Sequence, residues 1–139
     1  MKELSVSLDL CTQTLMLSEL CERLGRSPSA GSHNKGDPLP SPDDQTRVWT
    51  QTILRLDSNL NKDAPLKQHL ESLVAHFPPS EFSRPRILPE DAKVWISVGV
   101  FFDTVTVSLA VSPEELDIVK AYGASLEVSC YPCQSKSAT

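Results

Sequence analysis

The chain lacks any apolar segment long enough to span a bilayer. Its longest apolar run, from Val98 to Phe102, is far shorter than the roughly 20 residues that a transmembrane helix requires. Residues 1–10 alternate polar and apolar side chains, whereas a secretion signal presents a continuous apolar core. We therefore expect a cytoplasmic protein that does not bind membranes, in reducing conditions that keep its four cysteines as thiols.

The chain also has no excess of basic residues over acidic ones. The chain has 13 Lys and Arg against 18 Asp and Glu, so its formal net charge is -5. Nucleic-acid binders neutralise phosphates with a basic surface, and this balance argues against that class. We expect any protein partner of so acidic a chain to be basic.

No catalytic or cofactor-binding motif is present. The chain has five glycines and neither a Gly-rich phosphate loop nor a nucleophile elbow. The carboxylate pair Glu90-Asp91 is expected to face water, and the pair Glu114-Glu115 is expected to cap a helix. The loop residues Asp37, Asp43 and Asp44 lack a predicted apolar pocket, so we do not expect them to act as a general acid and base. His69 and His76 share one side of a predicted helix in partly exposed positions, while His33 lies in a solvated loop. We therefore expect no enzymatic activity, no catalytic residues, no bound metal and no cofactor.

The four cysteines leave a thiol or zinc site open as an alternative. Cys130 and Cys133 have the Cys-x-x-Cys spacing, but they end a predicted strand, and a reactive thiolate needs a helix N-terminus. Alternation along that strand points Cys130 into the core, and Cys21 lies on the apolar side of the first helix. Cys11 ends the first strand, so a zinc site with the last strand and His33 requires the two strand ends to meet.

Hydrophobic periodicity predicts an α+β fold. Strands are expected at 3–10, 47–56, 93–102, 105–111 and 125–131, with a tight turn at 103–104 making a hairpin of the third and fourth. Helices are expected at 17–24, at 63–76 with Asp63 as N-cap, and from Ser112-Pro113 to Gly123 with Leu116 and Val119 inward. Residues 26–46 and 78–92 read as long loops.

Two stretches repeat one strand–helix–Gly–strand unit. "VSLDL" is followed by a helix ending "ERLG", and "VSLAV" by a helix ending "KAYG". The repeat predicts a ferredoxin-like α/β sandwich, with a mostly antiparallel sheet and helices on one face. Residues 1–131 then form one domain, and 132–139 a flexible C-terminal tail.

Three stretches of the chain together resemble a known bacterial family. They are the leading strand and helix with Leu24-Gly25, Pro28, Gly36-Asp37 and Trp49, then "DAPLKQHLESLVAHF", then "LAVSPEELDIVKAYGASLEVSCY". Together they span nearly the whole chain and are similar to the domain of unknown function 4279 family; the proline-rich 78–92 segment and the terminal "CYPC" depart from its pattern. The resemblance implies an α+β fold and a bacterial cytoplasmic protein, and it supplies no catalytic residues. Families of this type often lie beside toxin genes as immunity proteins, so a toxin partner is an inference by analogy.

The strongest functional signal is a pair of aromatic residues. Trp95 and Phe101 have opposite parity to the apolar residues of their strand, so they emerge on the face of the sheet that the helices do not cover. An exposed aromatic patch indicates a contact surface, unless a loop such as 78–92 folds over it. The acidic residues Asp37, Asp43 and Asp44 of the first long loop add a second candidate contact surface.

These observations favour a non-enzymatic binding protein, such as a toxin-neutralising immunity protein. The first alternative is a small-ligand binding or sensor domain, which would bury its ligand between sheet and loops. The lesser alternative is a thiol redox or zinc protein. The oligomeric state stays open, since an exposed sheet edge would also serve self-association.

Overall fold

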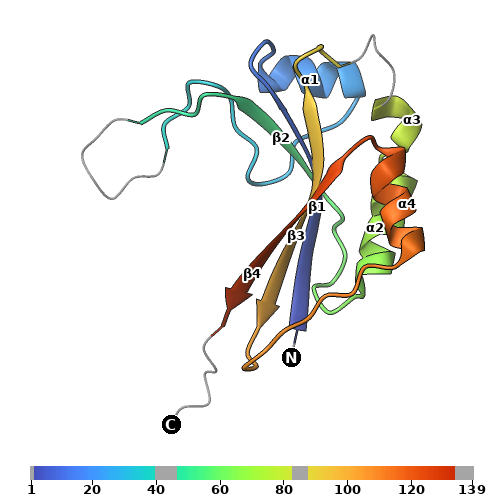
Figure 1. Ribbon diagram of the computed structural model, residues 1–139. Coiled ribbons are helices and arrows are strands. Elements are labelled where there is room, and N and C mark those ends of the chain that lie inside the picture. The colour runs from blue at the N-terminus through green and yellow to red at the C-terminus, as the bar shows by residue number, and fades with distance from the viewer. Residues whose placement is uncertain (1, 40–46, 83–87, 134–139) are drawn as a thin grey trace.

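The computed structural model describes residues 2–39, 47–82 and 88–133, and these form a single layer of sheet with helices on one face (Figure 1). The four strands lie in the order β2-β1-β3-β4. The strands are β1 (Lys2–Thr12), β2 (Thr52–Asp57), β3 (Lys93–Phe102) and β4 (Ser125–Pro132), and the helices are α1 (Leu17–Leu24), α2 (Leu66–His76), α3 (Pro79–Phe82) and α4 (Pro113–Ala121). The predicted α+β class is confirmed.

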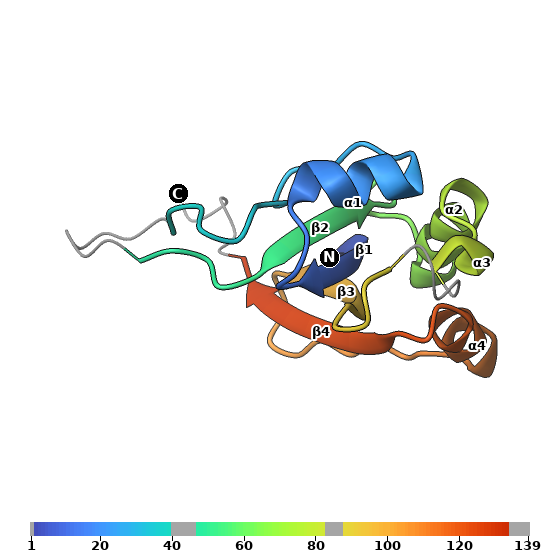
Figure 2. The ribbon, with the colours of Figure 1, turned by 90° about the horizontal axis from the view of Figure 1, so that it is seen from above.

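Alternation along the central strand β1 decides which face of the sheet is buried. Leu8 is 1% exposed and lies opposite Leu56 on β2 and Ile96 on β3, which are equally buried. Because alternate side chains point to the same face, the even-numbered apolar residues of the three strands form one surface. The helices cover that surface with Leu20, Leu24, Leu66, Leu70, Leu73, Phe82 and Val119. Seen from above, α2, α3 and α4 lie together on one side of the sheet and α1 lies beside β2 (Figure 2).

The helix boundaries follow their caps. Ser112 begins α4 as predicted: its hydroxyl accepts from the N–H of Glu115 at 3.2 Å, and the Glu115 carboxylate accepts from the N–H of Ser112 at 2.8 Å. Asp63 is not the N-cap of α2, which starts only after Pro65. Leu116 is 49% exposed rather than inward, while Val119 is buried. None of the helices in the described part of the chain is long and apolar enough to cross a membrane.

The predicted hairpin after β3 is wrong. Residues 103–112 form no strand; they leave the end of β3 and run back across the helix-covered side of the sheet to α4 (Figure 1). Val107, Leu109 and Val111 pack against the core, whereas Val105 is fully exposed at the turn. This alternation arises from packing onto the face of the sheet, not from pairing in its plane. The chain then returns through α4, so β4 pairs parallel to β3.

The sheet is therefore mixed. β1 pairs antiparallel with β2 and β3, and β3 pairs parallel with β4. The two sequence units that predicted a ferredoxin-like sandwich fold differently: the strands joined through α4 are parallel, and those joined through α1 are antiparallel. The prediction of helices on one face is confirmed, and the mostly antiparallel sheet only in part.

An arm of two chain segments joined by isolated bridges extends from the open end of β2, away from α2 and α4 (Figure 1). It contains residues 33–39 and 47–51 and is held by a backbone bond between Gly36 and Trp49 (2.8 Å) and, at its base, by two bonds between His33 and Ile53 of β2 (3.0 and 2.9 Å). The predicted strand 47–56 therefore splits between the arm and β2, and Trp49 belongs to the arm. His33, predicted to be solvated, is stacked on Trp49 with ring centroids 3.7 Å apart.

His69 of α2 is buried at 1% exposure, not partly exposed as predicted. Its Nδ1 lies 2.7 Å from the hydroxyl of Ser58, which is also buried, so the side chain holds the β2–α2 connection onto the helix. Burial lowers the pKa of His69 below its ordinary value of 6.5, and backbone groups of Ala64 and Asn61 offset part of this effect. His76 is exposed.

We predict that the protein loses stability in mild acid through His69. The unfolded chain binds a proton at His69 near pH 6.5 while the folded chain resists it, so the free energy of unfolding falls as the pH drops below about 6.5. Urea unfolding of His69→Gln between pH 7.5 and 5 should show a shallower pH dependence than the wild type. His76→Gln is the control and should keep the wild-type slope; the pKa of His33 is also lowered by burial, so some slope remains in both variants. An unchanged slope in His69→Gln contradicts this account.

Candidate functional site

The odd-numbered residues of the strands form a second face that no described helix covers. Its members, which we call the open face, are Ser5, Ser7, Arg55, Trp95, Ser97, Gly99, Phe101, Glu127, Ser129 and Tyr131. The alternation that buries the even positions places these side chains on the opposite side. They enclose a shallow hollow of about 520 Å³ with a floor of hydroxyl groups. Trp95 and Phe101 both lie on this face, as their parity predicted, but each is half-buried rather than exposed.

An aromatic cluster closes one end of the hollow. Phe101 and Tyr131 stack with ring centroids 5.1 Å apart and an angle of 21° between the planes, since β3 and β4 place them side by side. The ammonium group of Lys62 lies 5.3 Å from the centroid of Phe101, within cation–π range. Gly99 lies beneath these rings, and a Cβ there would make ordinary van der Waals contacts with Phe101 at 3.4 Å and Tyr131 at 3.6 Å. Tyr131 is 48% exposed and leaves much of its surface free for contact.

A buried charge supports the other end. Asp9 on β1 has no exposed surface. Its carboxylate accepts two bonds from the guanidinium of Arg55 on β2, both 3.2 Å, and one from the hydroxyl of Ser97 on β3 at 2.8 Å. The pairing satisfies Asp9 and holds Arg55 flat beside the hollow. The cationic charge of Arg55 is therefore already neutralised.

The sequence predicted that the acidic loop forms a contact surface, but the one acidic residue of it that the structure describes is engaged within the loop. Asp37 is half-buried and its carboxylate accepts the N–H of Asn34 at 2.8 Å, so it shapes the turn of the arm. Asp43 and Asp44 lie outside the described residues. The structure therefore places Asp37 on the arm and brings it into no described contact with the open face.

Asp91 is exposed, as predicted, and it also has a structural role. Its carboxylate accepts from the hydroxyls of Thr12 at 2.6 Å and Thr14 at 3.1 Å and from the N–H of Gln13 at 2.7 Å, which fixes the chain after β1. These bonds, those from Thr12 first, lower the pKa of the Asp91 carboxyl.

The cysteines do not converge. Cys11 pairs with Lys93 at the start of β3, and Cys130 pairs with Val100 near its end, so the two lie at opposite ends of the sheet. Cys130 points to the helix side but is exposed, contrary to the prediction, because β4 extends past the helices that would cover it. Cys133 is also exposed, and its N–H donates to Phe102, so the chain remains attached to the sheet beyond Tyr131. Residues 134–139 lie outside the described part. Among described residues, no three His, Cys, Asp or Glu side chains are grouped to hold a metal ion.

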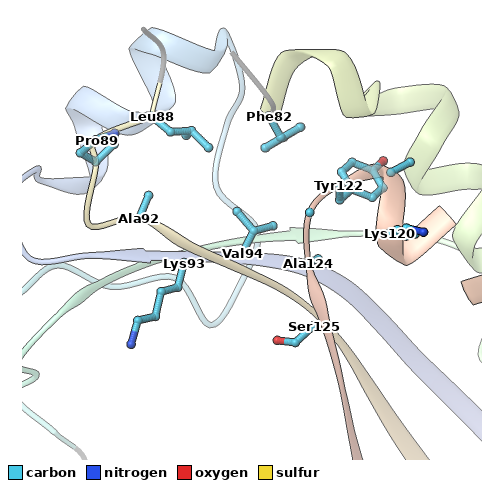
Figure 3. Close-up of a pocket in the computed structure, with 12 residues that line it drawn as sticks. Phe82, Leu88, Pro89, Ala92, Lys93, Val94, Lys120, Tyr122, Ala124 and Ser125 are labelled. Carbon is cyan, nitrogen blue, oxygen red and sulfur yellow. The ribbon is translucent and has the colours of Figure 1, made fainter. Parts of the chain in front are cut away.

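A larger hollow of about 830 Å³ lies beyond the ends of α3 and α4 (Figure 3). Its wall contains Phe82 and Tyr122, whose rings meet edge to face, and the Tyr122 hydroxyl donates to the carbonyl of Phe77 at 2.6 Å. Lys93 and Lys120 lie on opposite sides and point apart. Burial raises the pKa of Tyr122, which keeps this phenol neutral. The described residues of this wall hold no group of side chains arranged for chemistry.

Comparison with known proteins finds no match: no family model, no curated protein and no solved structure corresponds to this chain.

Sequence reasoning missed Tyr131, Arg55 and the serine floor. Parity along β4 puts Tyr131 opposite Leu126 and Val128, a signal that could have identified it. Arg55 carried no comparable signal, since its pairing with Asp9 depends on the register between β1 and β2.

We predict that Arg55→Met destabilises the fold by about 2 kcal/mol. Removing one member leaves Asp9 buried without its counter-charge, and the cost stays below the 3–5 kcal/mol of fully buried pairs because water reaches Arg55. Urea unfolding of Arg55→Met, Asp9→Asn and the double variant forms a double-mutant cycle. The double variant should lose much less than the sum of the two single losses. Strictly additive losses would show that the pair contributes no coupling.

Proposed function

We propose that this protein is a non-enzymatic binding protein that holds a basic protein partner against its open face. The observation that carries the proposal is the set of partly exposed aromatic rings, Trp95, Phe101 and Tyr131, on a sheet face that no described helix covers. Aromatic side chains dominate the binding energy of protein interfaces because they bury large areas at small entropic cost.

Charge supports a basic partner. The chain carries a net charge of -5, and the exposed Glu127 lies on the hollow. The two basic groups nearby are already engaged, Arg55 with Asp9 and Lys62 over the ring of Phe101. A Lys or Arg of the partner would gain from Glu127 and from the aromatic faces, whereas an acidic partner would find no free cation in the described hollow. We propose Asp37 on the arm, with Asp43 and Asp44 outside the described residues, as a second acidic contact surface.

The wider assignment rests on sequence resemblance. We propose membership in the domain of unknown function 4279 family, a bacterial cytoplasmic location, and a toxin as the basic partner, which makes the protein an immunity protein by analogy. A relation to ferredoxin-like sandwiches belongs to the same proposal and is supported by one strand–helix–strand unit, β3–α4–β4.

Trp95→Ala should weaken binding far more than it weakens folding. A partner recovered from lysate of the native bacterium is purified, its basic charge established, and its affinity measured by calorimetry for the wild type and the variant. Loss of a central aromatic contact is expected to cost about 2 kcal/mol of binding, roughly thirtyfold in Kd. The half-buried side chain should cost about 1 kcal/mol of folding stability at most.

Leu116→Ala is the matched control, since Leu116 is an exposed apolar residue on the helix side. It should leave the affinity unchanged. Equal losses of binding and stability in Trp95→Ala, or a stronger effect of Leu116→Ala, would contradict the proposal.

A small ligand in the same hollow is the second candidate. The volume of about 520 Å³ falls within the range of small-molecule sites, and the serine hydroxyls offer hydrogen bonds to a polar ligand. A ligand that binds the folded state alone raises the melting temperature. Thermal-shift screening with metabolites should then show a shift in the wild type that Trp95→Ala loses. The thiol or zinc alternative predicts fewer than four titratable thiols after unfolding, or bound metal.

A further inference from the structure

The two edges of the sheet differ in how their backbone is satisfied. The outer edge of β2 is closed by the preceding segment: Ser29 and His33 donate to the carbonyls of Arg55 and Ile53 at 2.9 and 3.0 Å. The N–H of Arg55 in turn donates to the hydroxyl of Ser32 at 2.8 Å. β4 forms the other edge, and no described segment pairs with its outer side.

The peptide groups on the outer side of β4 can be assigned by parity. The N–H of Cys133 donates to Phe102 on β3, and successive residues of a strand point their N–H and C=O groups to alternate sides. Odd-numbered residues of β4 therefore bond β3, and Leu126, Val128 and Cys130 direct their N–H and C=O groups outward. Exposed edges are usually protected by lysine, a bulge or an internal proline. β4 has no lysine, and its proline is the last residue.

We propose that β4 pairs antiparallel with β4 of a second copy of this chain. The twofold axis of this dimer lies midway between the two Val128 residues. In this register Val128 faces Val128 of the partner copy, and Leu126 faces Cys130. Every outward N–H and C=O of Leu126, Val128 and Cys130 then has a partner. In a register centred on Cys130, Val128 would face Pro132, and the Val128 carbonyl would find no donor because Pro132 lacks an N–H.

The side chains suit this self-pairing. Leu126, Val128 and Cys130 lie on one face, so the pairing joins two short apolar rows; Val128 is 44% exposed in the single chain. On the other face Glu127 lies directly opposite Ser129, and the two Glu127 carboxylates lie only on the diagonal, roughly 7–8 Å apart. No like charges meet directly across the new pair of strands.

Sedimentation velocity in reducing buffer tests this pairing over a range of concentrations. The wild type should form a dimer. Val128→Pro should weaken the dimer at least about tenfold, because it removes an outward N–H from each copy and leaves the bonds to β3 intact. Val128→Thr keeps the N–H and the branched shape and should remain dimeric. A wild type that stays monomeric, or a dimer that Val128→Pro leaves unchanged, overturns the proposal; circular dichroism confirms that each variant is folded.

Cross-linking gives a second readout that does not depend on Val128. The test variant has a Cys130→Ser, Cys133→Ser background and carries Glu127→Cys and Ser129→Cys. In the proposed register position 127 of one copy faces position 129 of the other in a non-hydrogen-bonded pair, about 4.5 Å between Cα atoms, which suits a disulfide. Oxidation with copper–phenanthroline should yield a covalent dimer at dilute protein. The control has the same background with Glu3→Cys and Ser5→Cys. Its two thiols lie on the central strand β1, away from the edge, so it should stay monomeric. Equal cross-linking of both, or of neither, contradicts the register.

Discussion

The central position of β1 is the constraint on which the rest of the structure depends. The side chains of a central strand lie on both faces of the sheet, and each face must be either buried against apolar groups or satisfied by polar partners. β1 meets this requirement differently on its two faces. Its even positions supply an apolar surface that every helix covers. Its odd positions include Asp9, which is fully buried and is satisfied by one residue from each neighbouring strand, Arg55 on β2 and Ser97 on β3. Because a slip of one residue would turn the leucines outward and separate Asp9 from Arg55, packing and charge specify the same register.

The sequence predicted those elements whose signals are local. β1, β3 and α4 could be located because alternation or a complete capping box marks each of them. The strand predicted at 105–111 failed for a physical reason: alternation reports which side chains meet the core, and Val107, Leu109 and Val111 do so from above the sheet, without a ladder of backbone bonds. Cys130 failed in the same way. Its parity was correct, but β4 extends past its helical cover, and only the arrangement of the helices shows this.

The candidate site divides along the same line. Parity within one strand was enough to place Trp95 and Phe101 on the face away from the helices. The support beneath that face was not predictable, because Asp9, Arg55 and Ser97 are brought together by pairing between strands that are distant in the sequence. The partner of Phe101 in the stack, Tyr131, depends on β4 returning parallel to β3, and the sequence had indicated a hairpin at that point.

The open face and the outer edge of β4 are coupled by geometry. The twofold axis between the two Val128 residues would stand perpendicular to the sheet. The open faces of two paired copies would therefore lie on the same side of the joined sheet. Tyr131 of one copy would then face Ser125 of the other, and Ser125 lies beside Trp95 in the register of β3 and β4. The stacked rings of Phe101 and Tyr131 would thus continue across the axis to the Trp95 ring of the partner copy. Two hollows that are each shallow would become one longer surface with aromatic rings along it, which would favour an extended, twofold-symmetric or bivalent partner over a compact one.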